Sequence, residues 1–229
     1  MDNTNYLKKN IIFSTTLGII SLALFFCSAG HPSDVPRIAV KGENRERLVF
    51  DTAGWPNEHP NRWLKENDKE LLKLYLEDFP YIKILEINNY GGNLQLAKEI
   101  SYLVEKYELD THTSSVCVSA CMVIYLAGKR RSIDKSAFLG FHQLKGKASD
   151  LEAQYNEQKD SYGWKTPFEY HEYYIDTVQE HIAWWQNYLL DRGVDPRFII
   201  KAFQNNSDSM WFPDQIDLYE NGVVTEPLN

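Results

Sequence analysis

Ser119 has the sequence surroundings best suited to nucleophilic chemistry. It lies in the segment 117–121, Cys-Val-Ser-Ala-Cys, between an apolar stretch typical of a strand and another typical of a helix. The free N–H groups and the dipole at the start of a helix would stabilise an oxyanion formed by attack of this hydroxyl. Serine is also a common residue before a helix, which is an ordinary structural reason for its position.

A pair of glycines is the second candidate element. The segment 88–92, Asn-Asn-Tyr-Gly-Gly, follows an apolar stretch and precedes a helical pattern. Glycine allows unusual dihedral angles and close approach of the backbone. The N–H groups of Gly91 or Gly92 could therefore complete an oxyanion hole with that of Ala120, although Gly-Gly pairs also occur in ordinary tight turns.

His142 is the candidate general base. It ends an apolar stretch in the segment 140–143, Gly-Phe-His-Gln, and polar sequence follows it. Near neutral pH an imidazole can accept the serine proton and return it to a leaving group. The remaining histidines lie in loops, at the start of a strand or on a long aromatic helix: His31, His59, His112, His171 and His181.

The elements that must position these residues alternate between strand and helix. Strands are predicted at 37–40, 47–51, 82–87, 111–118 and 137–142, and helices at 62–78, 94–107 and 120–127. This alternation predicts an α/β fold with a mainly parallel sheet and helices packed on it. In such folds ligands bind at the carboxyl ends of the strands.

The C-terminal part has a different pattern. Residues 143–168 are polar, contain several Gly and Pro residues and show no clear period, which predicts an insertion or a mobile flap. A long helix is predicted at 168–190, and its aromatic residues are typical of a core or a subunit interface. Shorter helices are predicted from 196 to 203 and from 213 onward, and a small strand at 223–224.

Residues 1–30 are predicted to be a signal peptide or a membrane anchor, separate from one domain at 37–229. Lys8 and Lys9 precede the uncharged stretch 11–26, and small residues follow it. If the segment is not cleaved, residues 11–29 are just long enough to span a bilayer and so anchor the protein in the membrane. The lysines before the stretch place the body outside the cytoplasm, in the periplasm or anchored in the inner membrane.

Charge and cysteine content narrow the classes of partner. The net charge of −8 and the single basic run outside the N-terminus, at 129–131, argue against binding to nucleic acid. Cys117 and Cys121 flank Ser119 and could form a disulfide in an oxidising compartment, but two small buried hydrophobic residues fit equally well. Two sulfurs alone do not make a metal site, so no metal is predicted.

In this order, the motifs resemble those of the proteolytic subunit of the Clp protease and, more closely, of exported Clp-protease-like proteins of bacteria. In that family a strand ends in a Gly-Gly turn, a small-residue turn carries the serine, the next helix ends in Ala-Gly, and a strand ends in His-Gln. The corresponding segments here are 88–92, 118–121, 126–128 and 140–143. The resemblance implies the ClpP/crotonase fold.

The same resemblance implies a serine hydrolase, specifically a peptidase, that needs no cofactor. It assigns Ser119 as the nucleophile, His142 as the general base, and the N–H groups of Gly92 and Ala120 as oxyanion donors, with an acyl-enzyme intermediate. The implied partner is a peptide or protein substrate. The export segment, the aromatic helix and the segment 143–168 depart from the family and argue against its ring, which leaves a smaller homo-oligomer as the expected assembly.

The third member of the triad is less well matched. The family's acid follows a helix and precedes the closing turn, and here that region is 205–208, Asn-Asn-Ser-Asp. Asp208 is favoured because only a carboxylate stabilises the imidazolium by charge. Asn206 is the alternative, and Asp176 is the fallback.

Three other interpretations are open on the sequence alone. A crotonase-like enzyme would use the same fold on acyl-thioesters, although export would separate it from cytosolic coenzyme A. A catalytically silent binding module would keep the fold and present a groove to a partner. A Ser-Lys hydrolase would use Lys98 or Lys129, the nearest lysines in the sequence, as its base.

Overall fold

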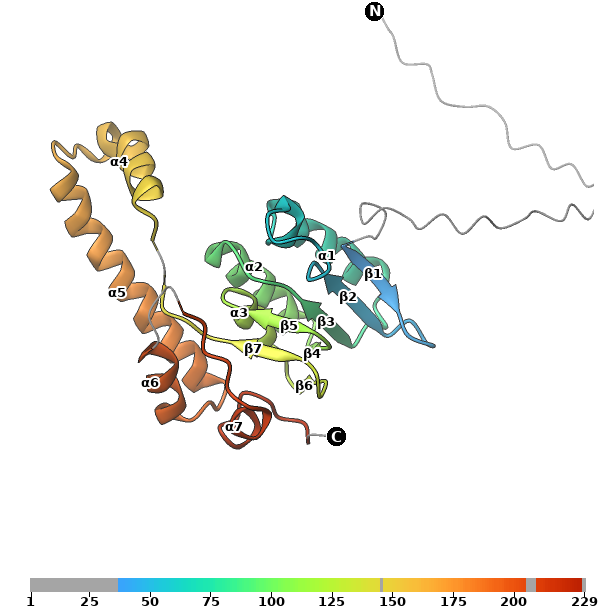
Figure 1. Ribbon diagram of the computed structural model, residues 1–229. Helices are drawn as coiled ribbons and strands as arrows, with labels where there is room; N and C mark the ends of the chain where they lie inside the picture. The colour runs from blue at the N-terminus through green and yellow to red at the C-terminus, as the bar shows by residue number, and fades with distance from the viewer. Residues whose placement is uncertain (1–36, 145, 205–208, 228–229) are drawn as a thin grey trace, which may run out of the picture. The chain divides into compact units, whose positions relative to one another are not determined.

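The computed structural model describes residues 37–144, 146–204 and 209–227, which form an α/β arrangement (Figure 1). The strands are β1 (Ile38–Lys41), β2 (Arg47–Asp51), β3 (Ile84–Asn88), β4 (Asp110–Thr113), β5 (Val116–Val118), β6 (Arg131–Ile133) and β7 (Phe138–Gly140). The helices are the short 3₁₀ helix η2 (Pro60–Arg62), α1 (Glu66–Asp78), α2 (Leu94–Lys106), α3 (Cys121–Leu126), α4 (Ala148–Tyr162), α5 (Pro167–Asp191), α6 (Pro196–Gln204) and α7 (Gln215–Glu220).

Two sheets carry the fold. The larger has the strand order β1-β2-β3-β4-β6, in which β1 is antiparallel to β2 and the other neighbours are parallel. The smaller consists of β5 and β7, which are parallel. The predicted α/β class with a mainly parallel sheet is therefore confirmed, and the antiparallel β1 makes the larger sheet mixed.

The helices bury apolar faces that the sequence pattern indicates. On α2 the buried residues include Leu96, Ile100 and Leu103, and they recur at the spacing of one helix face. All residues of α3 are buried, so this helix is a central element of the core. Because Ser119 directly precedes α3, the core fixes the element that carries it.

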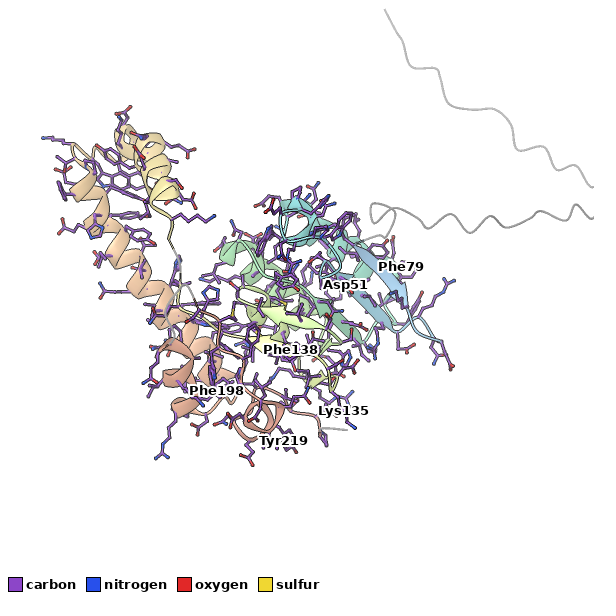
Figure 2. All side chains as sticks on the ribbon, in the orientation of Figure 1. Asp51, Phe79, Lys135, Phe138, Phe198 and Tyr219 are labelled. Carbon is purple, nitrogen blue, oxygen red and sulfur yellow. A yellow bond between two sulfur atoms is a disulfide. The ribbon has the colours of Figure 1, made fainter. Side chains whose placement is uncertain are left out.

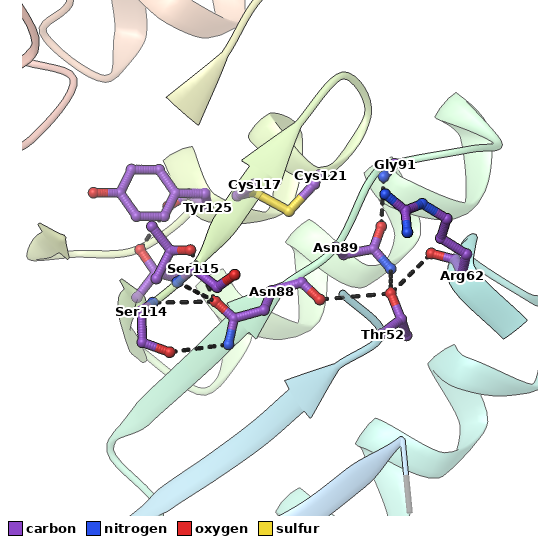
Figure 3. The surroundings of a disulfide bond; sticks show 12 residues. Thr52, Arg62, Asn88, Asn89, Gly91, Ser114, Ser115, Cys117, Cys121 and Tyr125 are labelled. Atoms are coloured by element: carbon purple, nitrogen blue, oxygen red, sulfur yellow. Dashed lines mark hydrogen bonds between the residues drawn. A yellow bond between two sulfur atoms is a disulfide. The ribbon is translucent and has the colours of Figure 1, made fainter. Parts of the chain in front are cut away.

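The strand predicted at 111–118 is in fact two strands. The chain bends between β4 and β5, and the side chain of Asn88, which is 1% exposed, stabilises this bend by hydrogen bonds. Its Oδ1 accepts hydrogen bonds from the hydroxyl of Thr113 and from the N–H groups of Ser114 and Ser115 (Figure 3). The bend moves β5 from the larger sheet into the smaller one, beside β7.

Residues 143–168 also differ from the prediction. Where a flap without regular structure was predicted, α4 occupies residues 148–162, ends at Gly163 in the left-handed conformation and lies beside α5. In Figure 1, α4 and α5 are the adjacent yellow and orange helices. None of the residues of α4 is buried, which is why its sequence shows no apolar period. The long helix predicted at 168–190 is confirmed as α5.

The closing strand predicted at 223–224 is not formed. Val223 and Val224 are buried, but their N–H groups both donate to the carbonyl of Leu218 in a turn after α7. The chain then runs past β6, where the N–H groups of Thr225 and Glu226 donate to the carbonyl of Arg131. The strand β6 was not predicted.

Arg131 ties the C-terminal segment to the body. Its side chain is almost fully buried, and its guanidinium donates to the carbonyl oxygens of Gly128, Arg192, Gly222 and Val223. One side chain thus joins the end of α3, the end of α5 and the turn after α7. No acidic side chain takes part in these hydrogen bonds.

Replacing Arg131 with methionine should lower the free energy of unfolding by about 3 kcal/mol, because several buried carbonyls lose a charged donor. Arg130→Met is the matched control: Arg130 is exposed and pairs with Asp110 on the surface, so its loss should change stability little. Urea denaturation of both variants measures the difference. Equal stability of the two variants would contradict the role given to Arg131.

The predicted export segment, residues 1–30, lies outside the described residues. Between residues 37 and 227, no described helix is long and apolar enough to cross a bilayer.

Candidate active site

Ser119 lies in a sharp turn between β5 and α3. Its φ angle is +58°, in the left-handed region that residues with a Cβ seldom adopt. Its N–H group donates to the carbonyl of Gly140 on β7, and its carbonyl accepts from Met122 in the first turn of α3. The backbone is therefore held on both sides of the serine.

The side chain of Ser119 meets that of His142. The distance from Ser119 Oγ to His142 Nε2 is 2.7 Å, a normal hydrogen-bond length, and both residues are half-buried. On the other side of the ring, Nδ1 lies 2.5 Å from the backbone carbonyl of Gln143. A carbonyl can only accept, so Nδ1 carries the proton and Nε2 is free to accept the serine proton.

Gln143 is itself anchored. Its side-chain Nε2 donates to the carbonyl of Phe203 near the end of α6, at 2.7 Å. Sequence reasoning missed the orienting role of the Gln143 carbonyl, since a main-chain acceptor leaves no signal in the residue types. The only hint in the sequence was that a glutamine, Gln143, directly follows His142.

The Gly91–Gly92 turn lies against this serine. Both glycines have positive φ angles, +88° and +134°. A Cβ on Gly91 would be 2.8 Å from the Ala120 nitrogen and 2.8 Å from the Val118 carbonyl oxygen. Only glycine therefore permits this approach to the turn that carries Ser119.

The three predicted oxyanion donors are not equivalent. The N–H group of Gly91 donates to Oδ1 of Asn89 at 2.6 Å, and Nδ2 of Asn89 donates to the hydroxyl of Thr52 (Figure 3). Gly91 therefore shapes the turn, and its N–H group is not an oxyanion donor because Asn89 already accepts its hydrogen bond. Within the described residues, the N–H groups of Gly92 and Ala120 donate no hydrogen bond, and both residues line the cavity at Ser119.

The cavity at Ser119 has a volume of about 780 Å³. Most of the side chains around it are apolar or aromatic and come from all parts of the fold: Trp63, Tyr90, Leu94, Met122, Phe141, Leu144, Trp185, Phe203 and Met210. Lys147 and Asp150 add one charge of each sign. The contributions of Trp63, Trp185 and Phe203 were not predicted, because they come from elements far from Ser119 in the sequence.

The helix α5 supports one wall of this cavity. Tyr188 is buried and donates its hydroxyl to the carbonyl of Val123 on α3, at 2.6 Å. Burial raises the pKa of Tyr188 to about 12, so the hydroxyl stays neutral and remains a donor. On α6, Phe198 (labelled in Figure 2) contacts Phe141, the residue before His142, with ring centroids 5.4 Å apart.

The candidates for the third triad residue are only partly described. Asp208 and Asn206 lie outside the described residues. Asp176 is exposed on α5, and among the described residues it has no hydrogen bond or ion pair with His142. The fallback is therefore unsupported, whereas Asp208 and Asn206 stay predictions.

The lysines considered as alternative bases are not beside Ser119. The ammonium of Lys98 lies 3.7 Å from the ring centroid of Trp184, and burial lowers the pKa of this lysine. Lys129 is exposed. Neither lysine lines the cavity at Ser119, so the geometry favours His142 over a Ser-Lys pair.

A second serine and histidine in contact occur on the larger sheet. His112 and Ser132 are opposite each other on β4 and β6, with 2.8 Å between Nδ1 and Oγ. Burial lowers the pKa of His112. Neither residue lines the cavity at Ser119, which makes the pair a useful control for Ser119 and His142.

Cys117 and Cys121 are joined by a disulfide, and both are fully buried. Figure 3 shows this bond linking β5 to the start of α3. Within the described part of the chain, no group of three or more His, Cys, Asp or Glu residues could hold a metal ion.

The sequence matches no protein-family model and no curated protein. Among solved structures, the fold is similar to that of ClpP1 from Listeria monocytogenes, with a TM-score of 0.50, 15% sequence identity, and coverage of 73% of this chain and 88% of that one. A mutant of the same ClpP1 matches with a TM-score of 0.49 and 17% identity over the same shares. At these identities the likeness concerns the fold, and the fold of this chain is ClpP-like.

Proposed function

We propose that this protein is a serine hydrolase, specifically a peptidase acting outside the cytoplasm, that forms an acyl-enzyme on Ser119. The observation that carries the proposal is the 2.7 Å hydrogen bond between Ser119 Oγ and His142 Nε2. The left-handed backbone of Ser119 and the oriented imidazole support it. The ClpP-like fold and the resemblance of the motifs support peptides as the substrate class.

The chemistry follows from these positions. Oγ of Ser119 attacks the carbonyl carbon of the scissile bond while its proton passes to Nε2 of His142. The oxyanion accepts hydrogen bonds from the N–H groups of Gly92 and Ala120. His142 then gives the proton to the leaving amine. Water next attacks the acyl carbon while His142 accepts a proton from it, and His142 returns this proton to Ser119 Oγ as the acid product leaves.

The cavity indicates which acyl groups fit. Its aromatic and apolar lining favours a large apolar side chain next to the scissile bond. Asp208 is the proposed third member of the triad, because Phe203 and Ser209, on either side of its segment, both line the cavity. In this proposal its carboxylate replaces the Gln143 carbonyl as the acceptor of the hydrogen bond from His142 Nδ1.

Peptide hydrolysis tests the proposal. Two fluorogenic peptides that differ only before the scissile bond, with leucine or aspartate there, should differ in kcat/KM by about tenfold or more in favour of leucine. Ser119→Ala should remove the activity, whereas Ser132→Ala, which also removes a serine in contact with a histidine, should retain it. Turnover of acyl-thioesters in place of peptides would favour the crotonase-like alternative.

A further inference from the structure

The disulfide spans the turn that carries Ser119. Cys117 lies two residues before the serine on β5, and Cys121 lies two residues after it as the first residue of α3. Their Cα atoms are 5.4 Å apart. The bond therefore fixes where the backbone enters and leaves the turn, and Ser119 is midway between the two anchors.

Ser119 needs such support because its backbone conformation is unfavourable. A residue with a Cβ in the left-handed region carries a cost of about 1 kcal/mol or more, and it keeps this conformation only where the surroundings enforce it. Within the turn, hydrogen bonds hold the N–H groups of Val118 and Ser119. The disulfide adds a covalent constraint to these contacts.

The same constraint acts on the oxyanion donors. β5 holds the glycine turn directly, since Asn89 N–H donates to the Val116 carbonyl and Val118 N–H donates to the Asn89 carbonyl. Gly91 in turn contacts the backbone of Ala120. A shift of α3 away from β5 would therefore move Ser119 Oγ away from His142 and Ala120 N–H away from Gly92.

We infer that the Cys117–Cys121 disulfide holds Ser119 in its reactive conformation, so that the reactivity of Ser119 depends on oxidation of this cysteine pair. The inference rests on the proposed function. Reduction by a dithiol breaks the S–S bond and gives two thiols, while the dithiol is oxidised to its own disulfide. The two thiol sulfurs then move apart to non-bonded distance, and because the site is fully buried and closely packed, we expect this movement to displace the backbone of the turn.

This dependence links activity to the compartment. Disulfides persist in oxidising compartments and are rare in the cytoplasm. The chain would be unreactive where it is synthesised and would become reactive after export. Because both sulfurs are buried, a reductant reaches them only when the turn opens locally, so the oxidised state persists once formed.

The test measures the rate at which a fluorophosphonate labels Ser119 in the full-length chain, with Cys27→Ser as the common background. Oxidised protein is compared with reduced protein and with the Cys117→Ala/Cys121→Ala variant, and thiol counts and circular dichroism confirm the redox state and the fold. Loss of the disulfide should lower the maximal labelling rate constant about 100-fold, as expected for a displacement of about 1 Å. The half-saturating probe concentration should stay within about twofold, because the cavity is retained.

Controls separate positioning from stability. Reoxidation should restore the labelling rate constant of the reduced protein, and the same treatment should not change the labelling rate constant of the double variant. A purely stabilising role would leave the rate constant unchanged while the folded fraction is near one. If the double variant does not fold, reduced protein with a native spectrum decides the question.

The outcomes distinguish the two claims. Equal rates in oxidised, reduced and double-variant protein would overturn the inference and leave the proposed hydrolase intact. Absence of labelling at Ser119 in oxidised, folded protein would contradict the proposed function itself, and the inference would fall with it.

Discussion

Replacing His142 with alanine should lower kcat/KM for a cleaved peptide by about 1,000-fold. The imidazole is the only described side chain that accepts a hydrogen bond from Ser119 Oγ, and general bases typically contribute between about 100-fold and 10,000-fold. Circular dichroism should show a native fold, since the ring is half-buried at the edge of the cavity. Steady-state hydrolysis of the leucine peptide measures the effect.

His112→Ala is the matched control. His112 is also half-buried and also contacts a serine hydroxyl at 2.8 Å, but it is outside the cavity at Ser119. This variant should keep its kcat/KM within about twofold, because a substitution away from the site usually changes free energies by no more than about 0.5 kcal/mol. If the two histidine variants lost activity equally, or if neither did, His142 would not be the base.

Gly91→Ala should lower kcat/KM about 100-fold in a protein that still folds. The added Cβ would be within 2.9 Å of the Ala120 nitrogen, the Val118 oxygen and the Ser119 Cβ. These atoms belong to the turn that carries Ser119, so relief of the clash must displace the nucleophile. A displacement of about 1 Å costs about 100-fold in rate, and overpacking of this kind costs about 1–3 kcal/mol of stability.

Gly163→Ala separates the clash from the backbone strain. Gly163 also has a positive φ angle, +73°, but no atom lies within 4 Å of a Cβ added there. The Gly163→Ala variant should be about 1 kcal/mol less stable, because alanine is strained in the left-handed conformation, and it should retain full activity. Hydrolysis and urea denaturation of both variants provide the comparison. Full activity of Gly91→Ala would contradict the close contact between the glycine turn and Ser119.

The elements around the site could be predicted because their apolar spacing is regular. The pattern on α2 and the apolar stretch before His142 both correspond to observed elements. The break between β4 and β5 could not be predicted, since it depends on Asn88, a residue distant in sequence that captures the backbone of the bend. Likewise α4, without a buried residue, has no apolar period to indicate a helix.

In the site, too, some features could be predicted from the sequence and others could not. Ser119 and His142 were singled out by residue type and by the resemblance of their motifs to those of the Clp-protease family, and the structure places their side chains in contact. The carbonyl of Gln143 and the use of the Gly91 N–H group by Asn89 are main-chain interactions. Such interactions depend on the folded backbone, and the residue types alone do not indicate them.

Ser119 can be tested directly as the nucleophile by labelling the oxidised, full-length chain with a fluorophosphonate and locating the modified residue by peptide mass. We expect one modified peptide that contains Ser119, absent from Ser119→Ala and His142→Ala and present in Ser132→Ala and His112→Ala. Labelling at another residue, or no labelling of folded protein with an intact Cys117–Cys121 disulfide, would contradict it and favour a catalytically silent binding module.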